Sequence, residues 1–170
     1  PPLVMHPETP SKHGGQNNSL VGLSRDVGML AVYGYSRLVG YDRNLNIVPD
    51  LLESVDVQEG RIFTLRLRKG HKWSDGTPFT TEDFRYFWED VANNKELSPG
   101  GPSIELLVDD QPPKVEFVDD RTIRYSWDKP NPYFIESQAQ AAPLWLYRPA
   151  HYLKKFHPRY TPPEEIAKAA

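Results

Sequence analysis

Hydrophobic and polar residues alternate along two stretches of this chain, and the alternation predicts β-strands. In the first stretch, Phe63, Leu65 and Leu67 are separated by polar residues, which is the period of a strand with one buried face. The second stretch, residues 114–127, repeats the pattern on both sides of an Asp119-Asp120 turn and predicts a hairpin. We therefore expect a mostly antiparallel sheet.

The apolar period becomes helical after Thr80. A helix is predicted from about Thr81 to Asn93, because one apolar stripe follows the i, i+3, i+4, i+7 spacing at Phe84, Phe87, Trp88 and Val91. Thr80 and Asp83 have the spacing of a helix cap. Just upstream, Asp75-Gly76 is a strong signal for a type I′ turn, since both residues tolerate positive φ.

Shorter elements are predicted on either side of this central region. Residues 19–24 are short enough for a buried strand, and residues 27–37 predict a helix that leads into a further strand. A turn is expected at Asn44, between strands. Short helices are expected after Asn131, from about Pro149 and over the last residues.

Composition excludes several classes of function. The 170 residues carry a net charge of -3, with a pI of about 6.0, so no basic field indicates a nucleic acid or an anionic membrane as partner. The absence of cysteine excludes disulfides, thiolate metal sites and cysteine nucleophiles. Residues 1–18 are polar and rich in turn formers, which predicts an extended lead-in. Without a signal-like start or a long apolar run, we expect a soluble chain, already trimmed of any signal.

Groups suited to catalysis or metal binding are sparse. His151 and His157 would lie on different faces of a helix, so no metal site is expected. The acid pairs Asp109-Asp110 and Asp119-Asp120 are interpreted as solvated turn residues. The basic run over residues 66–72 is balanced by acids at Glu53, Asp56 and Glu59, as on a solvated sheet face. With no nucleophile, zinc-protease or phosphate-loop motif, we expect neither an enzyme nor a cofactor.

The run from Ile47 to Val91 resembles the signature region of family 5 extracellular solute-binding proteins, the peptide, oligosaccharide or nickel receptors of ABC importers. Matching residues follow the family's order and spacing at Pro49, Leu52, Glu53, Ser54, Thr64, Leu65, Leu67, Arg68, Gly70, Trp73, Asp75, Gly76, Pro78, Thr80, Asp83 and Phe84. A second family element is similar to Asp120, Thr122, Pro130, Pro132 and Phe134. Thr81 departs from the family's usual alanine, which the start of a helix tolerates.

The resemblance implies a mixed α/β fold, namely part of a periplasmic-binding-protein-like fold of type II. In that fold the first lobe is interrupted by an inserted domain. The implied division is a lead-in over residues 1–18, the opening strand and helix of lobe one over 19–37, the inserted domain over 38–146, and the return toward lobe one over 147–170. Family members usually are much longer, so we expect an N-terminal fragment.

The resemblance also implies a function. The protein would be the substrate-binding component of an ABC importer, which captures peptides or a similar small solute outside the inner membrane and delivers it to the permease. It would be periplasmic or otherwise extracytoplasmic, monomeric and without a cofactor, and it would bind no nucleic acid.

In peptide-binding relatives the loop after the first strand lines the ligand cleft. The corresponding residues are Leu23, Ser24, Arg25 and Asp26. Asp26 is equally suited to capping the next helix, with Arg25 solvated. Some relatives also place an aromatic residue after a Ser-Pro pair, where it reaches the ligand. Here Ser98-Pro99 is followed by Gly100-Gly101, so that contact is missing.

One alternative lies outside transport, namely a carbohydrate-binding or carbohydrate-active extracellular β-rich module. Four tryptophans and nine tyrosines suit stacking on sugars. That use needs exposed rings, whereas Trp88 and Trp127 fall on apolar stripes. Exposure of the rings therefore discriminates between the two interpretations.

Overall fold

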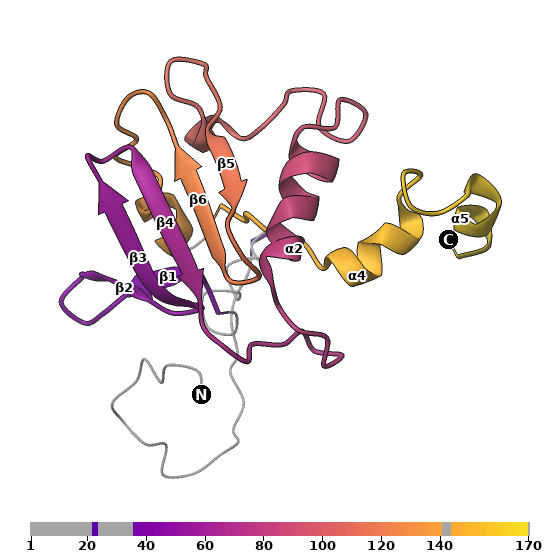
Figure 1. Ribbon diagram of the computed structural model, residues 1–170, viewed down its shortest axis with the longest axis horizontal. Coiled ribbons are helices and arrows are strands. Elements are labelled where there is room, and N and C mark those ends of the chain that lie inside the picture. Colours follow the sequence, from indigo (N-terminus) through magenta and orange to yellow (C-terminus); the bar gives the residue numbers. More distant parts are fainter. Residues whose placement is uncertain (1–21, 24–35, 141–143, 170) are drawn as a thin grey trace, which may run out of the picture.

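A computed structural model describes residues 22–23, 36–140 and 144–169 (Figure 1). Its centre is a four-stranded antiparallel sheet with the order β3 (Leu52–Gln58), β4 (Ile62–Leu67), β6 (Thr122–Ser126), β5 (Lys114–Phe117). A separate antiparallel hairpin is formed by β1 (Val39–Tyr41) and β2 (Ile47–Pro49). The predicted antiparallel sheet, with its strand at β4 and its β5–β6 hairpin, is confirmed.

Helices lie beside and behind the sheet. The helical segments are α2 (Thr81–Arg85), the π-helical η2 (Tyr86–Ala92), the 3₁₀ turn η3 (Ile104–Leu106), α3 (Glu136–Ala139), α4 (Ala150–Leu153), the 3₁₀ turn η4 (Lys154–Phe156) and α5 (Pro163–Ala169). Figure 1 shows α4 and α5 extending past α2, away from the sheet, to the end of the chain. The helices predicted near Thr81, after Asn131, from Pro149 and at the end are confirmed.

The core lies on one face of the sheet. Cross-strand pairing places Phe63 opposite Tyr125 and Leu65 opposite Ile123, and all four side chains are buried. Phe84 of α2, which is fully buried, belongs to the same apolar cluster. Because alternate residues of a strand point to opposite faces, the alternation in the sequence becomes this one-sided burial.

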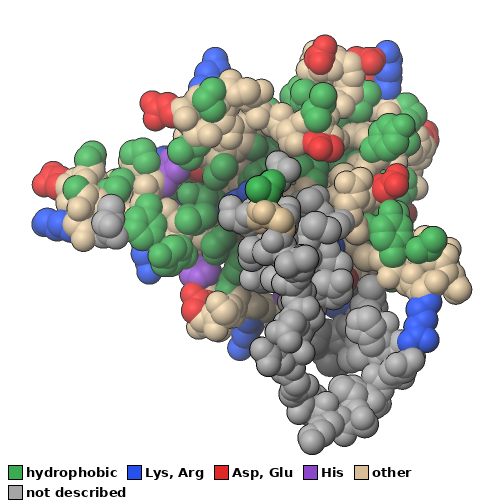
Figure 2. Space-filling model, turned by 180° about the vertical axis from the view of Figure 1, so that it is seen from behind, with side chains coloured by type: hydrophobic (Ala, Val, Ile, Leu, Met, Phe, Trp, Pro, Cys, Tyr) green, Lys and Arg blue, Asp and Glu red, His purple; other side chains and the backbone are tan. Residues whose placement is uncertain are grey.

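The opposite face of the sheet is charged and solvated. Glu53 pairs with Arg66 at 3.1 Å and with Arg121 at 3.6 Å, and all three side chains remain partly exposed. The Glu53–Arg66 pair agrees with the interpretation of the basic run as part of a balanced, solvated face, whereas Asp56 and Glu59 bond Gln58 and Arg61 instead. In the view from behind, hydrophobic side chains gather toward the middle and charged ones lie mostly around the outline (Figure 2).

The helix begins as predicted, although its buried stripe differs from the prediction. Thr80 and Asp83 form a capping box, with the backbone amide of Thr80 donating to the Asp83 carboxylate at 3.0 Å. Phe84 and Phe87 are buried, but the predicted stripe residues Trp88 and Val91 are only half-buried. The physical reason is the π-helical turn, where an extra residue per turn shifts the buried face.

Tyr86 and Asp90 are buried instead, against the end of the chain. Arg159 and the hydroxyl of Tyr160 each donate to the Asp90 carboxylate at 2.6 Å. Asp90 does not belong to the apolar stripe predicted from Phe84, Phe87, Trp88 and Val91. These partners allow the carboxylate of Asp90 to be buried, because a buried charge is tolerated only when it is paired and hydrogen-bonded.

The prediction of a type I′ turn at Asp75-Gly76 is wrong. Of these two residues only Gly76 has positive φ, 89°, and its amide donates to the Trp73 carbonyl at 2.9 Å. The central residues of the turn are therefore Ser74 and Asp75, with glycine following them, as in a three-residue hairpin loop.

A turn with positive φ at both central residues occurs at Asp109-Asp110, where φ is 50° and 60°. Val108 and Gln111 exchange two backbone hydrogen bonds of 3.0 Å across it. This is the type I′ geometry, which Asp tolerates. The acid pair is exposed, so its interpretation as solvated turn residues is confirmed.

Few residues of the opening strand and helix fall within the described ranges. Gly22 and Leu23 form a bend, so the strand predicted over 19–24 does not include them. The helix predicted over 27–37 lies outside the described residues except at its end, where Ser36 and Arg37 are not helical. Arg37 instead donates its amide to the Asp50 carboxylate at 2.9 Å, which fixes the approach to β1.

Candidate functional site

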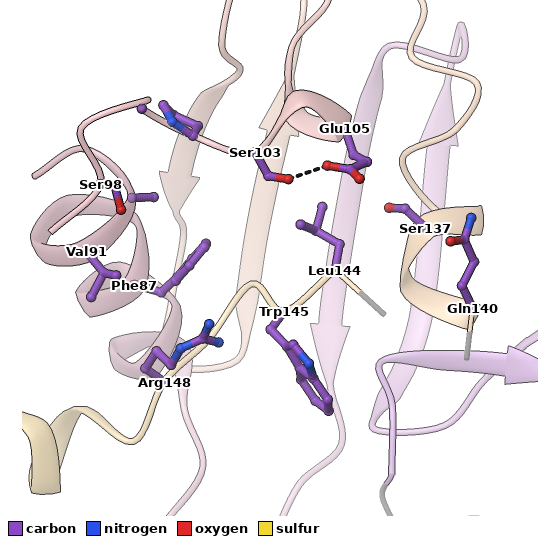
Figure 3. A pocket seen from close by; sticks show the side chains of 13 residues that line it. Phe87, Val91, Ser98, Ser103, Glu105, Ser137, Gln140, Leu144, Trp145 and Arg148 are labelled. Atoms are coloured by element: carbon purple, nitrogen blue, oxygen red, sulfur yellow. Dashed lines mark hydrogen bonds between the residues drawn. The ribbon is translucent and has the colours of Figure 1, made fainter. Parts of the chain in front are cut away.

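A cavity of about 490 Å³ lies where η2, the loop after it, α3 and the segment leading to α4 meet (Figure 3). Its wall is mixed in character, with aromatic and aliphatic groups beside hydroxyl, amide and charged groups. The lining residues are Phe87, Val91, Ala92, Ser98, Gly101, Pro102, Ser103, Glu105, Ser137, Gln140, Leu144, Trp145 and Arg148. Pockets of this size and mixed lining are typical of small-molecule sites.

The loop from Ser98 to Ser103 forms one rim of the cavity. It contains the Gly100-Gly101 pair that replaces the aromatic residue expected from the family resemblance. Gly101 has φ of 77°, which favours glycine. A Cβ atom built at either glycine would meet no atom within 4 Å. The backbone of this loop therefore has open space beside both glycines.

The segment Leu144–Pro149 forms the opposite wall. Its path is fixed at both ends, because Leu144 donates its amide to Ser137 at 2.9 Å and Arg148 donates its amide to the Asp83 carbonyl at 3.1 Å. This segment brings the Trp145 and Arg148 side chains to the cavity (Figure 3). The signature helix, through Asp83, thus positions a wall of the site.

The Arg148 guanidinium is the positive group of the cavity wall. It donates to the Tyr147 carbonyl at 2.8 Å and lies 5.2 Å from the centre of the Phe87 ring. Burial lowers the pKa of Arg148 below its ordinary value, because a desolvated charge is disfavoured.

Glu105 is the negative group that lines the same cavity, beside the Ser98–Ser103 loop. The Ser103 hydroxyl donates to its carboxylate, and this hydrogen bond lowers the pKa of Glu105 (Figure 3). Glu105 is exposed, so its charge stays in contact with water. The cavity wall therefore presents both signs of charge, one solvated and one partly desolvated.

A second cavity, of about 620 Å³, also borders the Leu144–Pro149 segment and has several aromatic side chains in its wall. Trp145 and Arg148 line both cavities. Phe79 and Tyr147 pack edge to face in the second one, with ring centres 4.9 Å apart. Nε2 of His71 is buried there without a hydrogen-bond partner, and burial lowers the pKa of this histidine.

The described structure does not test the residues predicted to line the ligand cleft. Leu23 has 55% of its surface exposed. Ser24, Arg25 and Asp26 lie outside the described residues. The prediction for this loop therefore stays a prediction. The cavity residues Trp145 and Arg148 were missed, and no local pattern in the sequence marks them.

The two histidines considered for metal binding have other partners. Nε2 of His151 lies 2.7 Å from the Asp75 carboxylate, and Nε2 of His157 lies 3.3 Å from the Asp90 carbonyl. Among the described residues, no three His, Asp or Glu side chains gather as a metal site would require. In the same part of the chain, the helices are too short or too polar to cross a bilayer.

Comparisons with known proteins find the same family that the signature resembles. Residues 46–167 match the model of bacterial extracellular solute-binding proteins, family 5. The periplasmic murein peptide-binding protein MppA of Escherichia coli is 32% identical over 64% of this chain and 22% of its own length. The periplasmic alpha-galactoside-binding protein of Rhizobium meliloti is also 32% identical, over 66% of this chain and 16% of its own length.

Among solved structures, the oligopeptide-binding protein OppA superposes with a TM-score of 0.66 and 34% identity, over 86% of this chain and 23% of that one. The likeness confirms the predicted mixed α/β fold class, part of a periplasmic-binding-protein-like fold of type II. The chain thus spans less than a quarter of the relatives it matches. It belongs to the family 5 bacterial extracellular solute-binding proteins.

Proposed function

We propose that this chain is part of the substrate-binding component of an ABC importer, which captures a peptide or similar small solute outside the inner membrane and delivers it to a permease. The observation that carries the proposal is the family match over residues 46–167. The periplasmic relatives named for binding murein peptide and oligopeptide support a peptide as solute and a periplasmic location. A binding role, rather than catalysis, is what this family membership supports.

Within that receptor, we propose the division expected from the resemblance: a lead-in over residues 1–18, the opening of lobe one over 19–37, an inserted domain over 38–146, and the return toward lobe one over 147–170. The cavity beside Arg148 and the loop Leu23–Asp26 would both face the solute. The size of this cavity supports the assignment, because ligand pockets commonly have volumes of about 300–1,000 Å³.

The test is a ligand screen on the full-length receptor by thermal unfolding. A solute that binds the folded state stabilises it by about 2.7 kcal/mol at 100 times its Kd. We expect a pool of short peptides to raise the Tm in proportion to the logarithm of its concentration. A Tm that no peptide shifts would contradict the peptide assignment.

An oligosaccharide is the second candidate solute, and the alpha-galactoside-binding relative is the observation that favours it. An alpha-galactoside arm in the same screen separates the two solutes. The alternative of a carbohydrate module outside transport has less support, because Trp127 is buried and Trp73, Trp88 and Trp145 are half-buried. None of these rings forms an exposed platform.

A further inference from the structure

The side chain of Arg148 has unused hydrogen-bonding capacity at the wall of the first cavity. A guanidinium carries five N–H donors in a planar fork. One terminal nitrogen donates to the Tyr147 carbonyl at 2.8 Å, and the Phe87 ring supports one face of the group. Figure 3 shows the guanidinium beside Phe87 and near Trp145. The remaining donors find no protein acceptor among the described residues.

No acidic side chain of the described residues pairs with this cation. By contrast, Arg85 is held by Glu82 at 2.5 Å, and Arg159 by Asp90 at 2.6 Å. A partly buried charge without a counter-ion is costly for a folded protein. Such a cost is commonly retained where the missing partner is a ligand.

We propose that Arg148 binds a carboxylate group of the transported solute. This inference rests on the proposed function, and it narrows the solute to one that carries a carboxylate. The fork of an arginine fits the two oxygens of a carboxylate, and such charge-assisted bonds strengthen where water is excluded. The cavity of about 490 Å³ has room for a small solute beside the guanidinium.

The charge of the wall further limits the solute. Glu105 lines the same cavity, and the hydrogen bond from Ser103 lowers its pKa, so its negative charge disfavours a solute with several negative charges. A solute with one carboxylate and a neutral or positive remainder fits both groups. A peptide with a free C-terminus and a sugar acid share this chemistry.

Calorimetry on the full-length receptor tests the proposal with four probes. These are a tripeptide pool with free C-termini, the same pool as C-terminal amides, a neutral alpha-galactoside trisaccharide, and its uronic-acid counterpart. The probes form two pairs, one of peptides and one of trisaccharides, and each pair has an acid and a neutral member. In the pair that the receptor binds, we expect the acid to bind about 10- to 100-fold more tightly than the neutral member, as for one charge-assisted hydrogen bond. In Arg148→Gln that preference should disappear, while affinity for the neutral partner is kept.

Two further variants separate this role from a structural one. Arg148→Lys keeps the positive charge but lacks the planar guanidinium, so it should leave a reduced preference for the acid probe. If Arg148→Gln fails to fold, the result for Arg148→Lys tests the proposal in its place. Arg124→Gln, on the solvated face of the sheet, should behave as the wild type. Wild-type binding that ignores the carboxylate, or an equal loss for acid and neutral probe in Arg148→Gln, would overturn this inference alone. Failure of all four probes to bind would overturn the proposed function with it.

Discussion

Replacing Asp83 by asparagine should destabilise the protein far more than its single-atom change suggests. The carboxylate is buried and accepts three hydrogen bonds from three parts of the chain. One oxygen accepts from the Thr80 amide at 3.0 Å and from the Trp73 indole at 3.1 Å, and the other accepts from the Ala150 amide at 3.0 Å. The group thus ties the hairpin before the helix and the start of α4 to the helix cap.

An asparagine has one acceptor oxygen, so its NH₂ group must face at least one N–H donor. Asp83→Asn therefore loses one or two bonds to a charged acceptor, each worth roughly 1.5–3 kcal/mol. Part of that loss is offset, because burial raises the pKa of Asp83 and so already disfavours its charge. We expect a net loss of about 2–4 kcal/mol, and a fall in Tm of roughly 4–16 °C for a domain of this size.

Urea unfolding followed by tryptophan fluorescence measures this loss, with Asp56→Asn as the matched control. Asp56 is exposed on β3 and accepts a hydrogen bond from the Gln58 side chain at 2.8 Å. Its replacement should change stability by no more than about 0.5 kcal/mol. If Asp83→Asn cost no more than Asp56→Asn, the three bonds would not hold these segments together.

Three further predictions concern the core, acid stability and binding. Phe84→Ala should cost about 3–5 kcal/mol in urea unfolding and Trp88→Ala clearly less, because Phe84 is fully buried and Trp88 half-buried; the reverse order would contradict the packing. Hydrogen bonds from Arg85, and then Lys154, lower the pKa of Glu82 from 4.5 to about 2, so its stabilisation is present above pH 4.5 and is lost as pH falls toward 2. Glu82→Gln should flatten the stability profile in that window, and an unchanged profile would refute the assignment. The isolated chain should bind peptides at millimolar Kd or not at all, and low-micromolar binding by calorimetry would place the site within the inserted domain.

Local patterns predicted much of the sheet and the start of the helix. β4 and the β5–β6 hairpin follow from alternation, and the cap at Thr80 from two residues at fixed spacing. The buried side of the helix was less predictable. The π-helical turn has no sequence signal that we recognised, and the burial of Asp90 depends on Arg159 and Tyr160 from the end of the chain.

The cavity could not be predicted from the sequence at all. Phe87, Ser103 and Arg148 come from a helix, a loop and a connecting segment, and tertiary packing alone brings them together. That no acidic side chain of the described residues pairs with Arg148 is likewise a property of the folded chain, which no local sequence pattern marks. The family signature indicated the scaffold, whereas the groups that face the cavity lie mostly outside it.

The order of the strands bears on how this protein avoids aggregation. β3 and β5 are the outer strands of the described sheet, so each presents unpaired backbone groups along one side. Glu53 and Asp56 on β3 and Lys114 on β5 are exposed charges, and β3 also contains a bulge. Charges and bulges on outer strands discourage a second sheet from joining edge to edge. Both outer strands of the described sheet therefore carry features that oppose edge-to-edge association of one copy of the chain with another.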